Sequence, residues 1–167
     1  MPVLAIHRFP DPLLKRPTLP VERLTPAVGK LIDSLTTTMR HHARCVGLAA
    51  PQVGSSLRVA VMDSSRHPDT TDSSGLLVLV NPVIVDLSGD SIRREGCLSI
   101  PDLTPNVRRG TRVRVRAQDQ AGHEYDMTLE GFEAIIAQHE IEHLNGRLFL
   151  DRVANLTTDV FRRKTYL

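Results

Sequence analysis

The stretch GFEAIIAQHEIEHLNG, residues 131–146, decides how this chain folds. Its apolar residues and both of its histidines recur at helical spacing, which predicts a helix over about 131–144. Asn145-Gly146 is a good C-terminal stop for that helix. One face is shared by Phe132, Ile135, Ile136, His139 and His143. We therefore expect these side chains to point into the protein.

The segments before this helix predict a mixed fold. A second helix is expected near 26–42, where Thr25 fits the N-cap and Pro26 the first helical position. The Pro-rich residues 1–24 are expected to form an extended arm with turns. Strands are predicted at 57–62, 76–80, 83–85, 112–116 and 123–129, with a break at Asn81-Pro82 and a hairpin between the last two.

The predicted fold class is α+β, with antiparallel strands packed around a central HExxH-bearing helix and a second, N-terminal helix. A weaker helix is expected over 151–163. The polar segment 63–75 is rich in Ser, Asp and Thr, so it is predicted to be a flexible loop. The length of 167 residues indicates a single catalytic domain over 1–167.

Composition excludes several classes of function. A formal net charge of +2 and an aromatic content of 4% without Trp argue against nucleic-acid specificity. No apolar run is long enough to cross a bilayer, and the N-terminus resembles neither a signal nor a transit peptide. Two cysteines, Cys45 and Cys97, fit a reducing compartment. A cytoplasmic, bacterial-type protein is therefore expected.

The sharpest chemical signal is His139-Glu140-Ile141-Glu142-His143. Histidines at i and i+4 lie one helical turn apart and can reach one metal, and a divalent metal lowers the pKa of water that it binds. Glu140 can reach that water without being a ligand. The motif alone leaves open that these are ordinary helix positions. Two unpartnered core histidines would nevertheless be costly, and a catalytic site needs a third protein ligand.

Three segments of the chain resemble the signature motifs of peptide deformylases. They are Gly47-Leu48-Ala49-Ala50-Pro51-Gln52, Glu95-Gly96-Cys97-Leu98-Ser99 and Gln138-HExxH-Leu144-x-Gly146, and they occur in the order typical of the family. Three further segments are similar to the family as well. They are Phe9-Pro10-Asp11-Pro12-Leu13 near the N-terminus, the pair Asn81-Pro82, and Gly146-x-Leu148-Phe149-x-Asp151 after the HExxH motif. The resemblance thus extends through most of the chain.

The resemblance implies a role for each motif. Cys97 becomes the third ligand, as a thiolate, beside His139 and His143. Glu140 carries the proton, and Gln52 with the backbone N–H of Leu98 holds the formyl oxygen as it gains charge. Considered alone, Cys97 would more often be a buried structural thiol, and Gln52 an ordinary polar loop residue.

A substrate pocket follows from the same resemblance. The residues predicted to bind substrate are Val46, Gly47, Glu95, Phe132, Ile135 and Ile136. Leu98 joins the apolar members around the methionine side chain, although a plain core is the alternative. Glu95 is expected to pair with Arg109 and hold its segment in place, the alternative being a surface ion pair of little value.

The implied function is hydrolysis of the N-formyl group from the initiator methionine of nascent polypeptides, releasing formate. One divalent metal per chain is expected: Fe(II) in the cell, with Zn, Ni or Co also suited to these ligands. N-formyl-Met peptides are the expected partners, and the basic tail Arg162-Arg163-Lys164 suggests ribosome contact. Two alternatives remain: a general zincin-type peptidase, and a catalytically weakened relative that binds N-terminal peptides.

Three positions depart from the family pattern. Cys45 stands where most members have Gly, Glu142 replaces Asp in the HExxH motif, and Thr104 stands where some relatives have a peptide-binding Arg. Cys45 could be a reactive thiol near the metal or a small apolar filler. Glu142 is expected to alter contacts around the ligands without binding metal.

Overall fold

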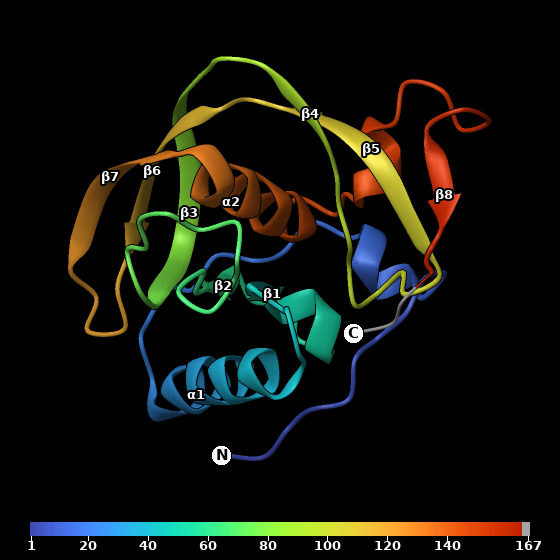
Figure 1. Ribbon diagram of the computed structural model, residues 1–167. Helices are drawn as coiled ribbons and strands as arrows, with labels where there is room; N and C mark the ends of the chain where they lie inside the picture. The colour runs from blue at the N-terminus through green and yellow to red at the C-terminus, as the bar shows by residue number, and fades with distance from the viewer. Residues whose placement is uncertain (165–167) are drawn as a thin grey trace.

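The computed structural model describes residues 1–164, so positions 165–167 of the predicted domain lie outside the described residues. It contains two α-helices, α1 (Pro26–His41) and α2 (Gly131–Leu144), and three short 3-10 helices, η1 (Pro12–Lys15), η2 (Ala50–Val53) and η3 (Phe149–Arg152) (Figure 1). The strands are β1 (Gly47–Ala49), β2 (Val59–Met62), β3 (Leu77–Ser88), β4 (Ser91–Arg94), β5 (Leu103–Arg109), β6 (Arg112–Gln118), β7 (Glu124–Glu130) and β8 (Val160–Arg162).

The strands form two antiparallel sheets, one with the order β1-β2-β3-β6-β7 and one with the order β4-β5-β8. The prediction of an α+β fold with antiparallel strands is thereby confirmed. The expected hairpin is also present, since β6 and β7 pair from Arg112 with Glu130 to Gln118 with Glu124. Along β6 the valines are buried and the arginines exposed, as alternation predicts.

Helix α1 begins as its sequence predicts. The Thr25 side chain accepts a hydrogen bond from the backbone N–H of Val28, and Pro26 occupies the first turn. Its buried face packs against β1 and β2 in one hydrophobic cluster, which includes Val28, Ile32, Leu35, Met39, Leu48, Val59 and Val61. This cluster supports the strand that leads into the Gln52 segment.

Helix α2 is buried on nearly every side. It contacts β1, β2, β3, β6 and β7 of the larger sheet and η2. In Figure 1 the arch of β4 and β5 passes over it, and α1 lies on the opposite side of the molecule. It ends at the predicted stop, where Gly146 adopts a φ of 73° and leaves room for the backbone of Lys15 and Arg16. Both histidines of the HExxH motif therefore lie in a packed environment.

Two secondary-structure predictions are wrong. The helix expected over 151–163 is absent: the chain instead forms η3, turns and then β8, which pairs with β5. The segment NLTTD, 155–159, offers few helix formers, and Asn155 accepts hydrogen bonds from Thr157 and Thr158 in a turn. The expected break at Asn81-Pro82 is a bulge within the continuous strand β3, because Asn81 adopts a φ of 51° and the register shifts there.

The polar segment 63–75 has no regular structure, but α2 holds it in two places. The buried carboxylate of Glu133 accepts hydrogen bonds from Ser64 Oγ at 2.7 Å and from the backbone N–H of Ser74 at 2.9 Å. Within residues 1–164, no helix combines the length and apolar character that crossing a bilayer would require.

Candidate metal centre

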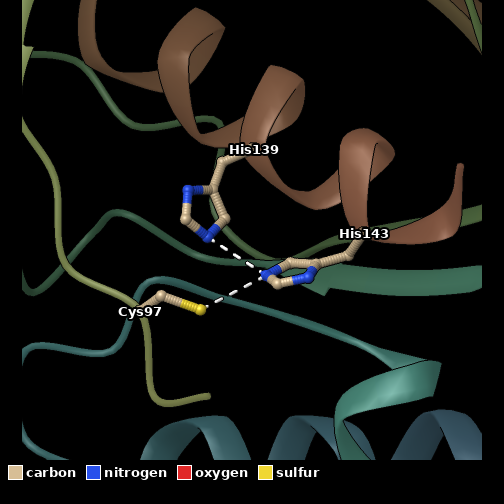
Figure 2. A group of neighbouring side chains, drawn as sticks. All are labelled: Cys97, His139 and His143. Atoms are coloured by element: carbon tan, nitrogen blue, oxygen red, sulfur yellow. Dashed lines mark hydrogen bonds between the residues drawn. The ribbon is translucent and has the colours of Figure 1, made fainter. Parts of the chain in front are cut away.

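Three side chains that can ligate a metal converge between α2 and the segment joining β4 to β5 (Figure 2). They are Cys97, His139 and His143, and their ligand atoms all lie within 4.8 Å of one another. The Nε2 atoms of the two histidines are 3.2 Å apart, and His143 Nε2 is 3.4 Å from Cys97 Sγ. Donor atoms about 2.0–2.3 Å from one ion lie roughly 3–4 Å from each other. The spacing therefore fits a single metal ion.

The protonation of these side chains also fits a cation. Burial lowers the pKa of His143 well below its usual value, so this imidazole stays neutral, as metal ligation requires. Burial acts in the same direction on His139, but Cys97 and Glu95 outweigh it and raise the pKa of His139. The surroundings of His139 thus favour a positive charge, which a bound cation would supply in place of the imidazole proton. Residues 1–164 contain no second group of three such ligands.

A buried ion-pair network lies behind His139. His139 Nδ1 is 2.8 Å from Glu95 Oε2, and Arg109 donates to both carboxylate oxygens of Glu95, at 2.7 and 3.0 Å. Arg109 also donates to Glu142 at 2.6 Å, and Arg152 pairs with the other oxygen of Glu142. Burial works to raise the pKa of Glu95, but His139 and Arg109 outweigh it and lower this pKa to about 2. The ionised Glu95 therefore orients the His139 ring.

This network decides between two interpretations of Glu95. The side chains of Arg109 and Glu95 are 1% and 6% exposed, so their pair is not a surface ion pair. Glu142, which we expected only to alter contacts, is a full member of the network and does not face the metal ligands.

Glu140 lies beside the ligands with a carboxylate oxygen that remains free. The residue is 4% exposed, and within residues 1–164 no group hydrogen bonds to its Oε2 atom. Burial raises the pKa of Glu140 to about 7. Gly47 approaches so closely that a Cβ atom there would lie 2.5 Å from Glu140 Oε1. The absence of a side chain at position 47 therefore makes room for this carboxylate.

The side-chain amide of Gln52 on η2 points at the same ligands. Its Oε1 atom accepts the backbone N–H of Ala49 at 3.0 Å, which fixes the amide orientation. Its Nε2 atom lies 3.6 Å from Cys97 Sγ and 3.2 Å from Ser99 Oγ. Because Gln52 is only 2% exposed, its N–H donors are shielded from water. The donor that faces Cys97 Sγ, at a long distance, is the one directed towards the candidate ligands.

A cavity of about 240 Å³ opens next to these groups. Its wall contains the whole predicted substrate-binding set, Val46, Gly47, Glu95, Phe132, Ile135 and Ile136. Gln52, Leu98 and Glu140 line the same cavity. The apolar side chains from α2 give it one wall that can accept an apolar group close to the metal ligands.

Cys45 also lines this cavity, where its thiol donates to the carbonyl oxygen of Gly47 at 3.2 Å. Burial raises the pKa of Cys45 to about 12. A thiol of this kind is a poor nucleophile, which favours the interpretation of Cys45 as a small filler.

Sequence patterns did not reveal two polar residues of the site. Ser99 accepts the hydrogen bond from Gln52, and Arg152 pairs with Glu142. Ser99 lies within the motif that contains Cys97, so its position could have suggested a role. Arg152 sits in the segment mistaken for a helix and gave no such signal.

Comparison with known proteins identifies similar chains over almost the whole length. A family model described as polypeptide deformylase matches residues 3–159. A peptide deformylase from Syntrophobacter fumaroxidans is 43% identical over 164 residues, which cover 98% of this chain and 94% of the relative.

Solved structures give the same result. The crystal structure of peptide deformylase from Thermotoga maritima matches with a TM-score of 0.84 at 35% identity, covering 93% of this chain and 100% of that one. A Met-Ala-Ser-bound class I type b peptide deformylase from Acinetobacter baumannii matches with a TM-score of 0.84 at 35% identity, covering 91% and 99%.

Proposed function

The chain belongs to the polypeptide deformylase family, a family of metalloenzymes that remove the N-formyl group from nascent polypeptides, and we propose that Cys97, His139 and His143 hold its metal. The observation that carries this proposal is the convergence of these three ligands, with Gln52 and Glu140 beside them, at one cavity. The family match favours deformylation over the zincin-type peptidase and the catalytically weakened relative.

The metal, once bound, would act as a Lewis acid and lower the pKa of a water molecule towards neutrality. The residues of this chain supply the remaining steps. We propose that Glu140 accepts the proton of the attacking water on Oε2, the oxygen without a partner among residues 1–164, and delivers it to the leaving amine. Its burial keeps the carboxylate away from competing solvent.

Gln52 would bind the formyl oxygen through its Nε2 amide group. The support is its orientation, since Ala49 occupies Oε1 and leaves the N–H donors directed towards Cys97. The backbone N–H of Leu98, in the wall of the same cavity, is the proposed second donor. Donors already fixed in place stabilise the developing negative charge without reorganising during the reaction.

The methionine side chain would lie against Val46, Phe132, Ile135 and Ile136, with Gly47 closing the cavity beside Glu140. Glu95 belongs to the same wall, where it orients His139. We further propose that the helix bearing HExxH is the centre of one catalytic domain over 1–167, and that segment 63–75 is its flexible loop.

Fe(II) is the proposed metal in the cell, with Zn, Ni and Co as functional substitutes, because a thiolate and two imidazoles suit all four. N-terminal peptides are the substrates of the family, and the Acinetobacter baumannii structure with Met-Ala-Ser supports the same mode of binding here. Since the substrates are new polypeptides, we propose that the enzyme acts in the cytoplasm and contacts the ribosome through the basic tail Arg162-Arg163-Lys164, of which Arg162 and Lys164 are the exposed members.

One experiment tests the proposal as a whole. Purified protein should hold about one metal per chain and release formate from formyl-Met peptides. Nearly all metal should be lost from each of three variants, Cys97→Ala, His139→Ala and His143→Ala. The control variant Lys30→Ala, which changes an exposed residue of α1, should keep its metal. Full metal retention in any of the three would remove that residue from the ligand set.

A further inference from the structure

The lining of the substrate cavity includes four arginines, and the described residues neutralise only part of their charge. The four arginines are Arg44, Arg93, Arg94 and Arg163. Arg93 forms an ion pair with Asp69 at 2.5 Å. Apart from Asp102, no carboxylate among residues 1–164 forms an ion pair with the other three arginines. The other acids in the wall are buried beside His139: Glu95, held by Arg109, and Glu140.

Arg163 is the arginine that lies against the segment carrying Cys97. It follows β8, and its backbone N–H donates to the carbonyl oxygen of Asp102 at 2.9 Å, which fixes where the side chain starts. Its guanidinium lies over Gly96, next to Cys97: a Cβ atom on Gly96 would be 2.1 Å from Arg163 Nη2. Its Nε atom is buried and, within residues 1–164, has no hydrogen-bond partner. A buried donor of this kind awaits an acceptor.

The other two arginines extend this surface across the opening. The Arg94 guanidinium stacks on the Phe161 ring at 3.8 Å, which holds it in place without neutralising its charge. Arg44 lies in the segment between α1 and β1, with a left-handed φ of 61°. It also lines an adjoining cavity that contains Arg66 and His67. A peptide leaving the metal site would pass among these cations.

We propose that Arg163, assisted by Arg94 and Arg44, selects formyl-Met polypeptides that carry Asp or Glu as the first or second residue after methionine. The inference rests on the proposed function, since it requires the formyl group to lie at the metal centre. A guanidinium pairs with a carboxylate through two parallel N–H donors, whereas it gains less from a neutral amide and repels a lysine. Arg163 would act in substrate binding and take no part in the proton transfer.

The test compares formyl-Met-Asp-Ala-amide and formyl-Met-Ala-Asp-amide with the matching Asn and Lys peptides. The C-terminal amide removes the terminal carboxylate, which would otherwise bind the same arginines. With metal-loaded wild type at low salt, kcat/KM should be about fivefold higher for Asp than for Asn at one of the two positions, mainly through KM, as for a partly exposed ion pair. High salt should reduce this preference.

Arg163→Gln should reduce the Asp-to-Asn ratio at least twofold, and Arg163→Lys, which keeps the charge, should retain more of the ratio. Arg23→Gln is the matched control, because Arg23 is exposed and lines neither cavity. Arg94→Gln provides a second test if Arg163→Gln unfolds at a lower temperature. Wild type that deformylates Asp and Asn peptides equally, or an undiminished ratio in Arg163→Gln, would overturn the inference alone. Failure to deformylate any peptide would instead overturn the proposed function.

Discussion

Glu140 owes its proposed role to one carboxylate oxygen that no group within residues 1–164 engages. Glu140→Gln preserves the shape of the side chain but cannot accept the proton, so we expect kcat to fall by about 10²–10⁴-fold. Because Glu140 does not belong to the ligand group, the metal content should stay near one per chain. Metal analysis and formate release measure the two quantities. A folded, metal-loaded variant with wild-type kcat would disprove the proton-transfer role.

Gln52 is expected to act on the transition state more than on bound substrate. Gln52→Ala should lower kcat on the order of a hundredfold while KM changes less, because the oxygen gains negative charge only as the reaction proceeds. Ser99→Ala is the control: it removes the partner of Gln52 Nε2 and leaves both amide donors in place. Steady-state kinetics measure kcat and KM for both variants. A defect confined to KM would mean that Gln52 only binds the ground state.

At the scale of single residues, helical spacing could predict two of the candidate ligands, whereas the third followed only from the family resemblance. The spacing of His139 and His143 on a helix indicates a shared metal directly. Cys97 lies 46 residues away from His143 in the chain, and no periodicity connects the two. Its role came from the likeness of its segment to a family motif. The contacts of Ser99, Arg152 and Arg163 depend on how distant strands meet, which no local pattern encodes.

At the scale of elements, a chain of buried charges joins β5, α2 and η3. Glu142→Ala would leave Arg109, 1% exposed in its side chain, with Glu95 as its remaining partner. Removing one member of such a buried group typically costs about 3–5 kcal/mol of unfolding free energy. Glu130→Ala breaks an exposed pair with Arg112 and should cost below about 1 kcal/mol. Urea unfolding of the metal-loaded variants measures both free-energy changes. Equal losses of unfolding free energy in Glu142→Ala and Glu130→Ala would contradict the expected difference between the buried and the exposed pair.

Both main helices could be predicted because their evidence is local: caps, apolar spacing and a glycine stop all lie within one segment. Strands β1, β4 and β5 could not be predicted from local evidence. Strand β1 has only three residues, and β5 contains Pro105 and four polar or charged side chains without clear alternation. What makes β5 a strand is its pairing with β4 and with the distant β8.

At the scale of the whole molecule, the metal would join two parts of the fold that are distant in the sequence. Cys97 belongs to the segment between β4 and β5, and both histidines belong to α2. An ion that binds only the folded protein stabilises it, so chelation should lower the melting temperature of wild type by several degrees, and added Zn should restore it. His143→Ala should show no chelator effect. A wild-type melting temperature that is indifferent to metal loss would contradict this coupling.

The burial of α2 also has a consequence for how slowly a bound ion could escape. Because nearly all of Glu133–Leu144 is buried, its amide protons should exchange with solvent deuterium only when the whole domain opens. The two histidines cannot then fray away from an ion one at a time. Cys97 lies outside regular structure, so a smaller local opening would be enough to release it. The lifetime of the ion would therefore be limited by the thiolate, although the helix supplies two of its three bonds.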